Sequence, residues 1–272
     1  MSRIITQADL RELFVLNLKN IDPSRWTCVI PAAGKGTRLG YGLPKILYPI
    51  LGQTVLKHLI NLFHEFCSSF VVVASPNGGQ AIQKEFESCC QSTDFRIVIQ
   101  EEPKGMAHAI WQARCIVKTP NTLVVWGDQI CLRNNTIFYT LAYHQNHAEN
   151  ILTFPTVMKK NPYIHFHRDN AGKILKVLQK RENEIKMEVG ENDCGFFCFS
   201  THSLFYLLKK SLSSRDALGS QTKEINLLQL FPQFENIAGQ VNTLRIAHEE
   251  ETLGINTIQE ALTAETILRD RN

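Results

Sequence analysis

The stretch that decides the fold is Pro31-Ala-Ala-Gly-Lys-Gly-Thr-Arg-Leu-Gly-Tyr-Gly-Leu-Pro-Lys45. A short apolar run rich in strand-forming residues, 27–30, comes directly before it. Residues 53–63 follow it, with apolar side chains at helical spacing. The sequence therefore predicts a strand, a glycine-rich loop and a helix, in that order.

The loop lies in a basic part of the chain. Between Pro23 and His64 there is no Asp or Glu, against five cations: Arg25, Lys35, Arg38, Lys45 and Lys57. Small residues let backbone N–H groups surround an anion, and cations at fixed offsets neutralise it. We therefore expect this loop to bind phosphate groups.

Two familiar phosphate-loop patterns are excluded. The P-loop ends in Gly-Lys-Ser/Thr, and the sequence has no such ending here. The dinucleotide fingerprint G-x-G-x-x-G needs a glycine where Leu39 stands, and the next glycine is Gly40. The loop is either another class of nucleotide-binding loop or an ordinary glycine-rich turn.

The composition is that of a globular protein. The 272 residues are 44% hydrophobic and 20% charged, enough for one large α/β domain or two small ones. The net charge of +3 is too small to indicate a nucleic-acid partner, and no apolar run is long enough to span a membrane. The eight cysteines contain no C-x-x-C pair, and the amino terminus does not resemble a signal peptide. We expect reduced thiols and a cytoplasmic protein with neither a membrane nor a nucleic-acid partner.

Beyond the loop, strands and helices alternate as far as residue 157. The predicted strands are 70–74, 96–100, 123–128 and 151–157, and the predicted helices are 81–89, 107–117 and 136–146. This alternation predicts an α/β fold with a doubly wound, mostly parallel, Rossmann-like sheet.

The pattern differs at the two ends of the chain. Strand-like segments at 164–168, 173–180 and 195–200 predict an antiparallel extension of the sheet. Helices at 204–211 and 225–230, a strand at 241–247 and a helix at 257–268 follow. Near the amino terminus, 9–18 reads as an amphipathic helix, so 1–26 are expected to form an N-terminal helical extension.

The string Ala32-Ala-Gly-x-Gly-Thr-Arg, with Pro44-Lys45 and Leu47-x-Pro49 behind it, resembles the signature of the sugar-nucleotide pyrophosphorylases. The resemblance covers about 27–268 and is nearest to the uridylyltransferase domains that act on N-acetylglucosamine 1-phosphate, without their acetyltransferase domain. It implies one nucleotidyltransferase domain at 27–272, with a nucleotide-binding half (27–157) and a sugar-phosphate-binding half (158–272). The implied small-molecule substrates are an NTP (UTP, or else dTTP or CTP) and a sugar 1-phosphate, which give an NDP-sugar and pyrophosphate.

The resemblance also implies roles in the nucleotide half. Arg38 and Lys45 would be catalytic, and the triphosphate would lie on Ala32, Ala33, Gly34, Lys35, Gly36 and Thr37. In the second matching region, Gln100-Glu-Glu-Pro-Lys-Gly105-Met-Ala-His-Ala109, Gln100 and Gly105 would read the base. An amide suits that task because it offers a donor and an acceptor in one plane.

Two residues are candidate ligands for Mg²⁺. Asp128 ends an apolar run, at the sheet edge where open parallel sheets bind ligands. Mg²⁺ prefers few carboxylates together with phosphate oxygens and water. The motif Gly254-Ile-Asn-Thr257 resembles the family's closing motif, which implies Asn256 as the second ligand. For each residue the alternative is a helix N-cap.

The sugar half departs from the family pattern. Lys180, with Arg181 as second choice, stands where relatives contact the sugar phosphate; a solvated charge is the alternative. Asp193 replaces an asparagine and Gln179 a glutamate, and both are assigned to the sugar phosphate. Two further departures are Pro162-Tyr-Ile-His165, in place of a glycine-rich turn, and Leu228, in place of a threonine. We therefore expect N-acetylglucosamine 1-phosphate to be a poor substrate, and one with free hydroxyls or an amine to be better.

Two other functions remain open at this point. One is nucleotidyl transfer to a phosphorylated alcohol or amino alcohol that is not a sugar. The other is a nucleotide-binding regulatory module without turnover. The presence of Arg38, Lys45 and Asp128 together favours an enzyme.

Overall fold

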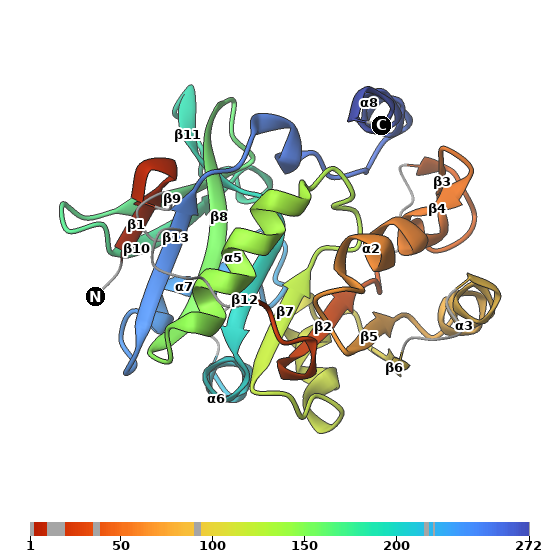
Figure 1. Cartoon of the computed structure of the whole chain (residues 1–272), viewed down its shortest axis with the longest axis horizontal. Coiled ribbons are helices and arrows are strands. Elements are labelled where there is room, and N and C mark those ends of the chain that lie inside the picture. Colours follow the sequence, from red (N-terminus) through yellow and green to blue (C-terminus); the bar gives the residue numbers. More distant parts are fainter. Residues whose placement is uncertain are drawn as a thin grey trace.

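A computed structural model describes residues 3–9, 20–34, 39–89, 94–214, 218–219 and 221–271. Its centre is a nine-stranded sheet in the order β1-β13-β8-β12-β7-β2-β5-β6, with β11 paired to β8 (Figure 1). The strands are β1 (Arg3–Thr6), β2 (Trp26–Pro31), β5 (Ser69–Ala74), β6 (Asp94–Ile99), β7 (Asn121–Val125), β8 (Asn150–Lys160), β11 (Val189–Asp193), β12 (Phe196–Ser200) and β13 (Gln240–Arg245).

Most of the sheet is parallel. Strand β2 lies between β5 and β7, and β13 lies between β1 and β8, all in parallel register. Strand β12 runs antiparallel to both β7 and β8. A separate antiparallel hairpin is formed by β9 (Ile164–Arg168) and β10 (Ile174–Gln179). The predicted fold class, a mostly parallel α/β sheet with an antiparallel extension, is confirmed.

Helices cover both faces of the sheet. Helices α2 (Val55–Phe63), α5 (Asn134–Asn146) and α8 (Ile258–Arg271) contribute to the apolar cluster that contains Trp26 and Phe63. Helices α4 (Met106–Gln112), α6 (Thr201–Leu212) and α7 (Phe231–Phe234) contribute to the cluster on the other face. Helix α3 (Gly79–Cys89) and the small β3–β4 ribbon (Pro49–Ile50 and Gln53–Thr54) lie at one end of the molecule. No helix in the described ranges is long and apolar enough to cross a membrane.

The structure differs from the sequence prediction in three places. Residues Arg3–Thr6 form a strand, β1, at the edge of the main sheet, where the prediction had only a helical extension. Most of the helix predicted at 9–18 lies outside the described residues. The helix predicted at 225–230 is instead a 3-10 turn, Leu228–Leu230, that leads into α7.

Strand direction determines where the loops gather. The parallel neighbours β2, β5, β6 and β7 end at the same edge of the sheet, after Pro31, Ala74, Ile99 and Val125. The antiparallel β12 begins at this edge, because Phe196 pairs with Val125. The phosphate loop, the Gln100 loop and Asp128 therefore meet at one edge, as the sequence predicts.

A buried ion pair attaches the β9–β10 hairpin to the main sheet. Arg168 on β9 donates to Glu191 on β11 at 2.8 and 3.1 Å, and the two side chains are 8% and 3% exposed. Thr156 on β8 also donates to Glu191, and Arg168 donates to Thr243 on β13. Four strands are thus joined through one carboxylate and its guanidinium partner.

We predict that Glu191→Ala destabilises the protein by about 3–5 kcal/mol, because it leaves the Arg168 guanidinium buried without its partner. Urea unfolding measures this loss. Asp94→Ala, which removes the exposed Asp94–Arg96 pair, is the control and should leave the midpoint unchanged. A midpoint for Glu191→Ala equal to that of the control would contradict the role given to the buried pair.

Candidate functional site

A cavity of about 810 Å³ opens at the carboxyl edge of the parallel strands. Its volume lies in the range of small-molecule sites. Of the predicted site residues, it is lined by Ala32, Ala33, Gly34, Lys45, Gln100, Gly105, Asp128, Gln179, Asp193 and Asn256. Lys35, Gly36, Thr37 and Arg38 lie outside the described residues. The cavity therefore brings residues from both predicted halves together.

Three of the lining residues, Lys45, Asp128 and Asn256, are connected through their side chains. The Nζ atom of Lys45 lies 2.5 Å from Oδ2 of Asp128 and 3.0 Å from Oδ1 of Asn256. Lys45 directly follows Pro44, Asp128 lies just after β7, and Asn256 lies in the loop before α8. In the sequence, Asp128 and Asn256 are 83 and 211 positions from Lys45. A carboxylate oxygen and an amide oxygen thus converge on one cationic atom, an arrangement that fits a hard cation such as Mg²⁺.

Neither Asp128 nor Asn256 serves as a helix N-cap, the alternative role considered for each. The hydroxyl of Thr257 accepts from the backbone of Glu260 at the start of α8, so Thr257 is the residue that caps this helix. The carboxylate of Glu260 in turn accepts from the backbone N–H of Asn256, which fixes that residue beside the cavity. After Asp128 the next α-helix begins only at Asn134. The side-chain oxygens of Asp128 and Asn256 are therefore directed to Lys45.

The described residues contain no group of three or more His, Cys, Asp or Glu side chains that could hold a metal ion by themselves. A pair of oxygen ligands is compatible with Mg²⁺, which is commonly bound through one or two protein oxygens, substrate phosphates and water.

The side chain of Gln100, which also lines the cavity, is held by two neighbours. Its side-chain amide nitrogen donates to the Gly105 carbonyl at 3.1 Å and lies 2.9 Å from Nδ1 of His108. Gly105 has φ +98°, and a Cβ there would lie 2.7 Å from the backbone of Ile225, so only glycine fits. Both amide hydrogens of Gln100 are committed, so its carbonyl oxygen is the group that remains for a ligand.

His108 determines which way this amide is turned. Its Nε2 atom lies 3.0 Å from the side-chain amide nitrogen of Gln112, so both ring nitrogens face amide nitrogens. Burial, and next the charge of Lys104, lower the pKa of His108, so the ring is neutral at pH 7. A neutral ring accepts only one hydrogen, and Gln100, 4% exposed and anchored on Gly105, supplies it.

The sugar half of the cavity contains polar atoms with and without partners. Oε1 of Gln179 accepts from Arg181 at 3.1 Å and from Asn226 at 2.6 Å, and its buried amide nitrogen has no partner among the residues that the structure describes. Oδ1 of Asp193 accepts from the backbone of Gly195 at 2.7 Å, and its Oδ2 likewise has no described partner. Burial raises the pKa of Asp193 to about 6, although the bond from Gly195 opposes this shift.

Lys180 is exposed and does not line the cavity, whereas Arg181, the second choice, does. Strand β10 ends at Gln179, and a 3-10 turn over Lys180–Glu182 follows. The turn leaves Arg181 bonded to Gln179 and 3.5 Å from Glu224. Of the two predicted cations, Arg181 lines the cavity and Lys180 does not.

Several polar residues that line the cavity were not predicted from the sequence, among them Gln129, Lys159, Asn192 and Asn226. Oδ1 of Asn192 accepts from the backbones of Tyr163 and Ile164, so these two N–H groups are already bonded. Lys159 donates to the hydroxyl of Thr252 at 2.8 Å. Among these residues, only Gln129 could have been suspected from the sequence, because it directly follows the predicted site residue Asp128.

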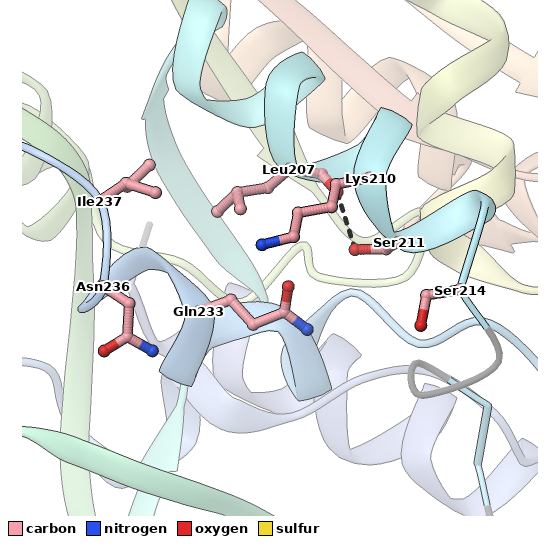
Figure 2. Close-up of a pocket in the computed structure, with 7 residues that line it drawn as sticks. All are labelled: Leu207, Lys210, Ser211, Ser214, Gln233, Asn236 and Ile237. Atoms are coloured by element: carbon pink, nitrogen blue, oxygen red, sulfur yellow. Dashed lines mark hydrogen bonds between the residues drawn. The ribbon is translucent and has the colours of Figure 1, made fainter.

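A second, smaller pocket of about 220 Å³ lies between α6 and the segment around α7 (Figure 2). Leu207, Lys210, Ser211, Ser214, Gln233, Asn236 and Ile237 line it. Lys210 carries the only charge among these lining residues, and none of them is a predicted site residue. The larger cavity is the candidate site.

Comparison with known proteins identifies a family that matches more than half of the sequence. Residues 28–189 match the MobA-like NTP transferase domain family. The bifunctional protein GlmU of Syntrophomonas wolfei is 29% identical over 248 residues, which cover 90% of this chain and 53% of that protein. GlmU of Streptococcus mutans is 27% identical over 248 residues, covering 89% and 52%. The chain thus spans about half the length of these relatives.

Solved structures share the fold. A UDP-glucose pyrophosphorylase complexed with UDP-glucose superposes with a TM-score of 0.67 at 14% identity, over 90% of this chain and 99% of that one. The 4-diphosphocytidyl-2C-methyl-D-erythritol synthase of Anaerococcus prevotii has a TM-score of 0.64 at 14% identity, over 91% and 100%. Since the family match covers more than half of the sequence, this chain belongs to the MobA-like NTP transferase domain family.

Proposed function

We propose that the protein transfers a nucleotidyl group from an NTP, with UTP favoured, to a sugar 1-phosphate in a Mg²⁺-dependent reaction. The observation that carries this proposal is the convergence of Lys45, Asp128 and Asn256 in a cavity that also contains Gln100 and the polar groups of the sugar half. The similarity to GlmU and to UDP-glucose pyrophosphorylase supports the same reaction class.

This reaction requires little covalent catalysis by the protein. An oxygen of the sugar phosphate attacks the α-phosphorus of the NTP, the bond to the bridging oxygen of the β-phosphate breaks, and pyrophosphate leaves with that electron pair. The attacking phosphate is already ionised at neutral pH, so no general base is required. Catalysis then comes from orientation and from charge stabilisation at the α-phosphorus.

Different residues of the cavity and of the glycine-rich loop orient the substrates and stabilise the developing charge. Lys45, together with Arg38 from the glycine-rich loop, holds the triphosphate and stabilises the charge that develops on it. Gln100 positions the base, and Arg181 neutralises the sugar phosphate. Asp128 and Asn256 hold Mg²⁺, which supplies further charge neutralisation when it is bound.

The experiment that tests this proposal is a screen of pyrophosphate release, with the four NTPs against a panel of sugar 1-phosphates and Mg²⁺. We expect release with a pyrimidine nucleotide, and only when a sugar 1-phosphate is present. Nucleotide binding without release for any pair would instead identify a regulatory nucleotide-binding module.

We predict that Lys45→Ala and Arg38→Ala each lower turnover by about 100-fold or more, the scale of losing one positioned transition-state donor. Steady-state kinetics on variants with confirmed folding measure the loss. Lys57→Ala is the matched control, because Lys57 belongs to the same carboxylate-free stretch but lies on α2 and does not line the cavity. Activity of Lys45→Ala close to that of the control would refute its role.

We predict that Asp128→Asn raises the Mg²⁺ concentration needed for half-maximal activity at least tenfold, because an amide oxygen replaces the charged ligand. A metal titration of activity measures this, and calorimetric titration of Mg²⁺ into the nucleotide complex measures it without turnover. Full activity of the native protein in excess chelator, or an unchanged titration for the variant, would exclude a metal at Asp128.

We predict that His108→Ala raises the KM for UTP about tenfold with kcat nearly unchanged, because the freed amide of Gln100 loses one anchoring hydrogen bond. His108→Asn, whose carbonyl oxygen can accept the same hydrogen, should recover part of the loss. In a Gln100→Ala background the His108→Ala substitution should have little further effect. A second tenfold loss in that background would mean that His108 acts elsewhere.

A further inference from the structure

Two buried oxygen atoms in the cavity wall have no hydrogen-bond donor within the described part of the chain: Oδ2 of Asp193 and Oε1 of Gln129. Both residues line the cavity, and they are 4% and 6% exposed. A buried polar atom without a partner costs free energy, so such atoms are rare outside sites that receive a ligand. These two unpartnered acceptors in the cavity lining therefore indicate that a hydrogen-bond donor is missing.

Both side chains pack against the same piece of backbone. The N–H of Gly195 donates to Oδ1 of Asp193 at 2.7 Å. A Cβ on Gly195, which has φ +72°, would lie 2.3 Å from Cγ of Gln129. Gln129 and Asp193 thus both lie beside Gly195, directly before β12, and we call this part of the cavity lining the corner.

The neighbouring protein cations are bonded to other groups. Lys45 contacts Asp128 and Asn256, and Lys159, whose charge influences Asp193, donates to Thr252. The side-chain amide of Asn192 donates to the backbone carbonyl of Asp193, not to its carboxylate. Within the described part of the chain no protein group donates to these two oxygens, so a ligand can supply the missing donor.

We propose that this corner receives the free ammonium group of a phosphorylated amino sugar, the second substrate of the nucleotidyl transfer proposed above, on which this inference rests. An ammonium group has three hydrogens and can donate to both oxygens at once, whereas a hydroxyl has one hydrogen and can donate to one. The positive charge also pairs with the ionised carboxylate of Asp193, and charge-assisted hydrogen bonds are the stronger kind.

An acylated nitrogen does not suit the corner. Its single N–H can satisfy only one of the two oxygens, and its acyl group has to fit into a lining that also contains the buried side chain of Ile164. The N–H groups of Tyr163 and Ile164, which could have bound an acyl carbonyl, are already bonded to Asn192. The buried amide nitrogen of Gln179, which also lines the cavity and has no partner among the described residues, is available for a sugar oxygen.

The test measures binding separately from turnover. Calorimetry in Mg²⁺ and a non-hydrolysable UTP analogue gives Kd values for glucosamine 1-phosphate, glucose 1-phosphate and N-acetylglucosamine 1-phosphate. We expect the amine to bind at least about tenfold more tightly than the hydroxyl sugar and about 100-fold more tightly than the acylated sugar. Equal or tighter binding of either competitor by the native protein overturns the proposal.

Three variants identify the residues responsible. Asp193→Asn should reduce the preference for the amine, measured as the Kd of glucose 1-phosphate divided by that of glucosamine 1-phosphate, to about threefold or less. Gln129→Met should reduce this ratio in part. Glu249→Gln, which removes one negative charge at the cavity rim, is the charge-matched control and should keep the order of the three ligands. If the control loses the preference as Asp193→Asn does, general electrostatic attraction explains it and the proposal fails.

Two further measurements complete the design: the binding of phosphoethanolamine and the release of pyrophosphate. Binding of phosphoethanolamine as tight as that of glucosamine 1-phosphate would overturn the assignment to a sugar, because the ammonium alone would then suffice. If the ligands bind in the expected order but no NTP releases pyrophosphate with them, the proposed function fails and the inference about the corner stands. If pyrophosphate is released but the acylated sugar is preferred, the proposed function stands and the inference about the corner fails.

Discussion

The contact of Lys45 with Asp128 and Asn256 is the interaction on which the rest of the site depends. A carboxylate at the end of a buried strand is costly unless a cation or water stabilises it. Here the side chains of Asp128 and Lys45 are only 14% and 22% exposed, so the ion pair is partly desolvated and correspondingly strong. Because its members come from three distant segments, this one cluster fixes the loop before α2, the end of β7 and the approach to α8 around a common point.

The same cavity shows two kinds of polar group. Those on the nucleotide side, such as Gln100, have their hydrogen bonds completed by neighbours, which presents one defined face to a ligand. Those at the corner of Asp193 and Gln129 are left incomplete. If the proposed function is correct, completed hydrogen bonds around Gln100 and incomplete ones at the corner are the arrangement expected of a common reaction with an uncommon second substrate.

Local patterns were enough to predict much of the fold and part of the site. The apolar run before the glycine-rich loop and the helical spacing after it predict β2 and α2, and the alternation that follows predicts a parallel sheet. The rule that ligands bind at the carboxyl edge of such a sheet places Gln100 and Asp128 in one cavity. These predictions hold because strand direction, once set, determines where every loop lies.

What could not be predicted depends on contacts between distant residues or on a single backbone turn. Strand β1 has only four residues, and it exists through its pairing with β13, more than 230 positions away. Lys180 and Arg181 are adjacent, so the 3-10 turn after Gln179 decides which of them reaches the cavity. That Gln129 has an unpartnered oxygen follows only from the three-dimensional packing around Gly195, since the local sequence marks this glutamine merely by its place after Asp128.

If the cavity works as proposed, the α-phosphorus of a nucleotide is transferred in it to a phosphorylated sugar. Phosphorus NMR of the protein with UTP, Mg²⁺ and glucosamine 1-phosphate follows this transfer at the reacting atom itself. We expect the coupled resonances of a new diphosphate ester together with one equivalent of free pyrophosphate, and neither in the absence of the sugar phosphate. Formation of UDP and inorganic phosphate, or a spectrum that does not change, would contradict the transfer.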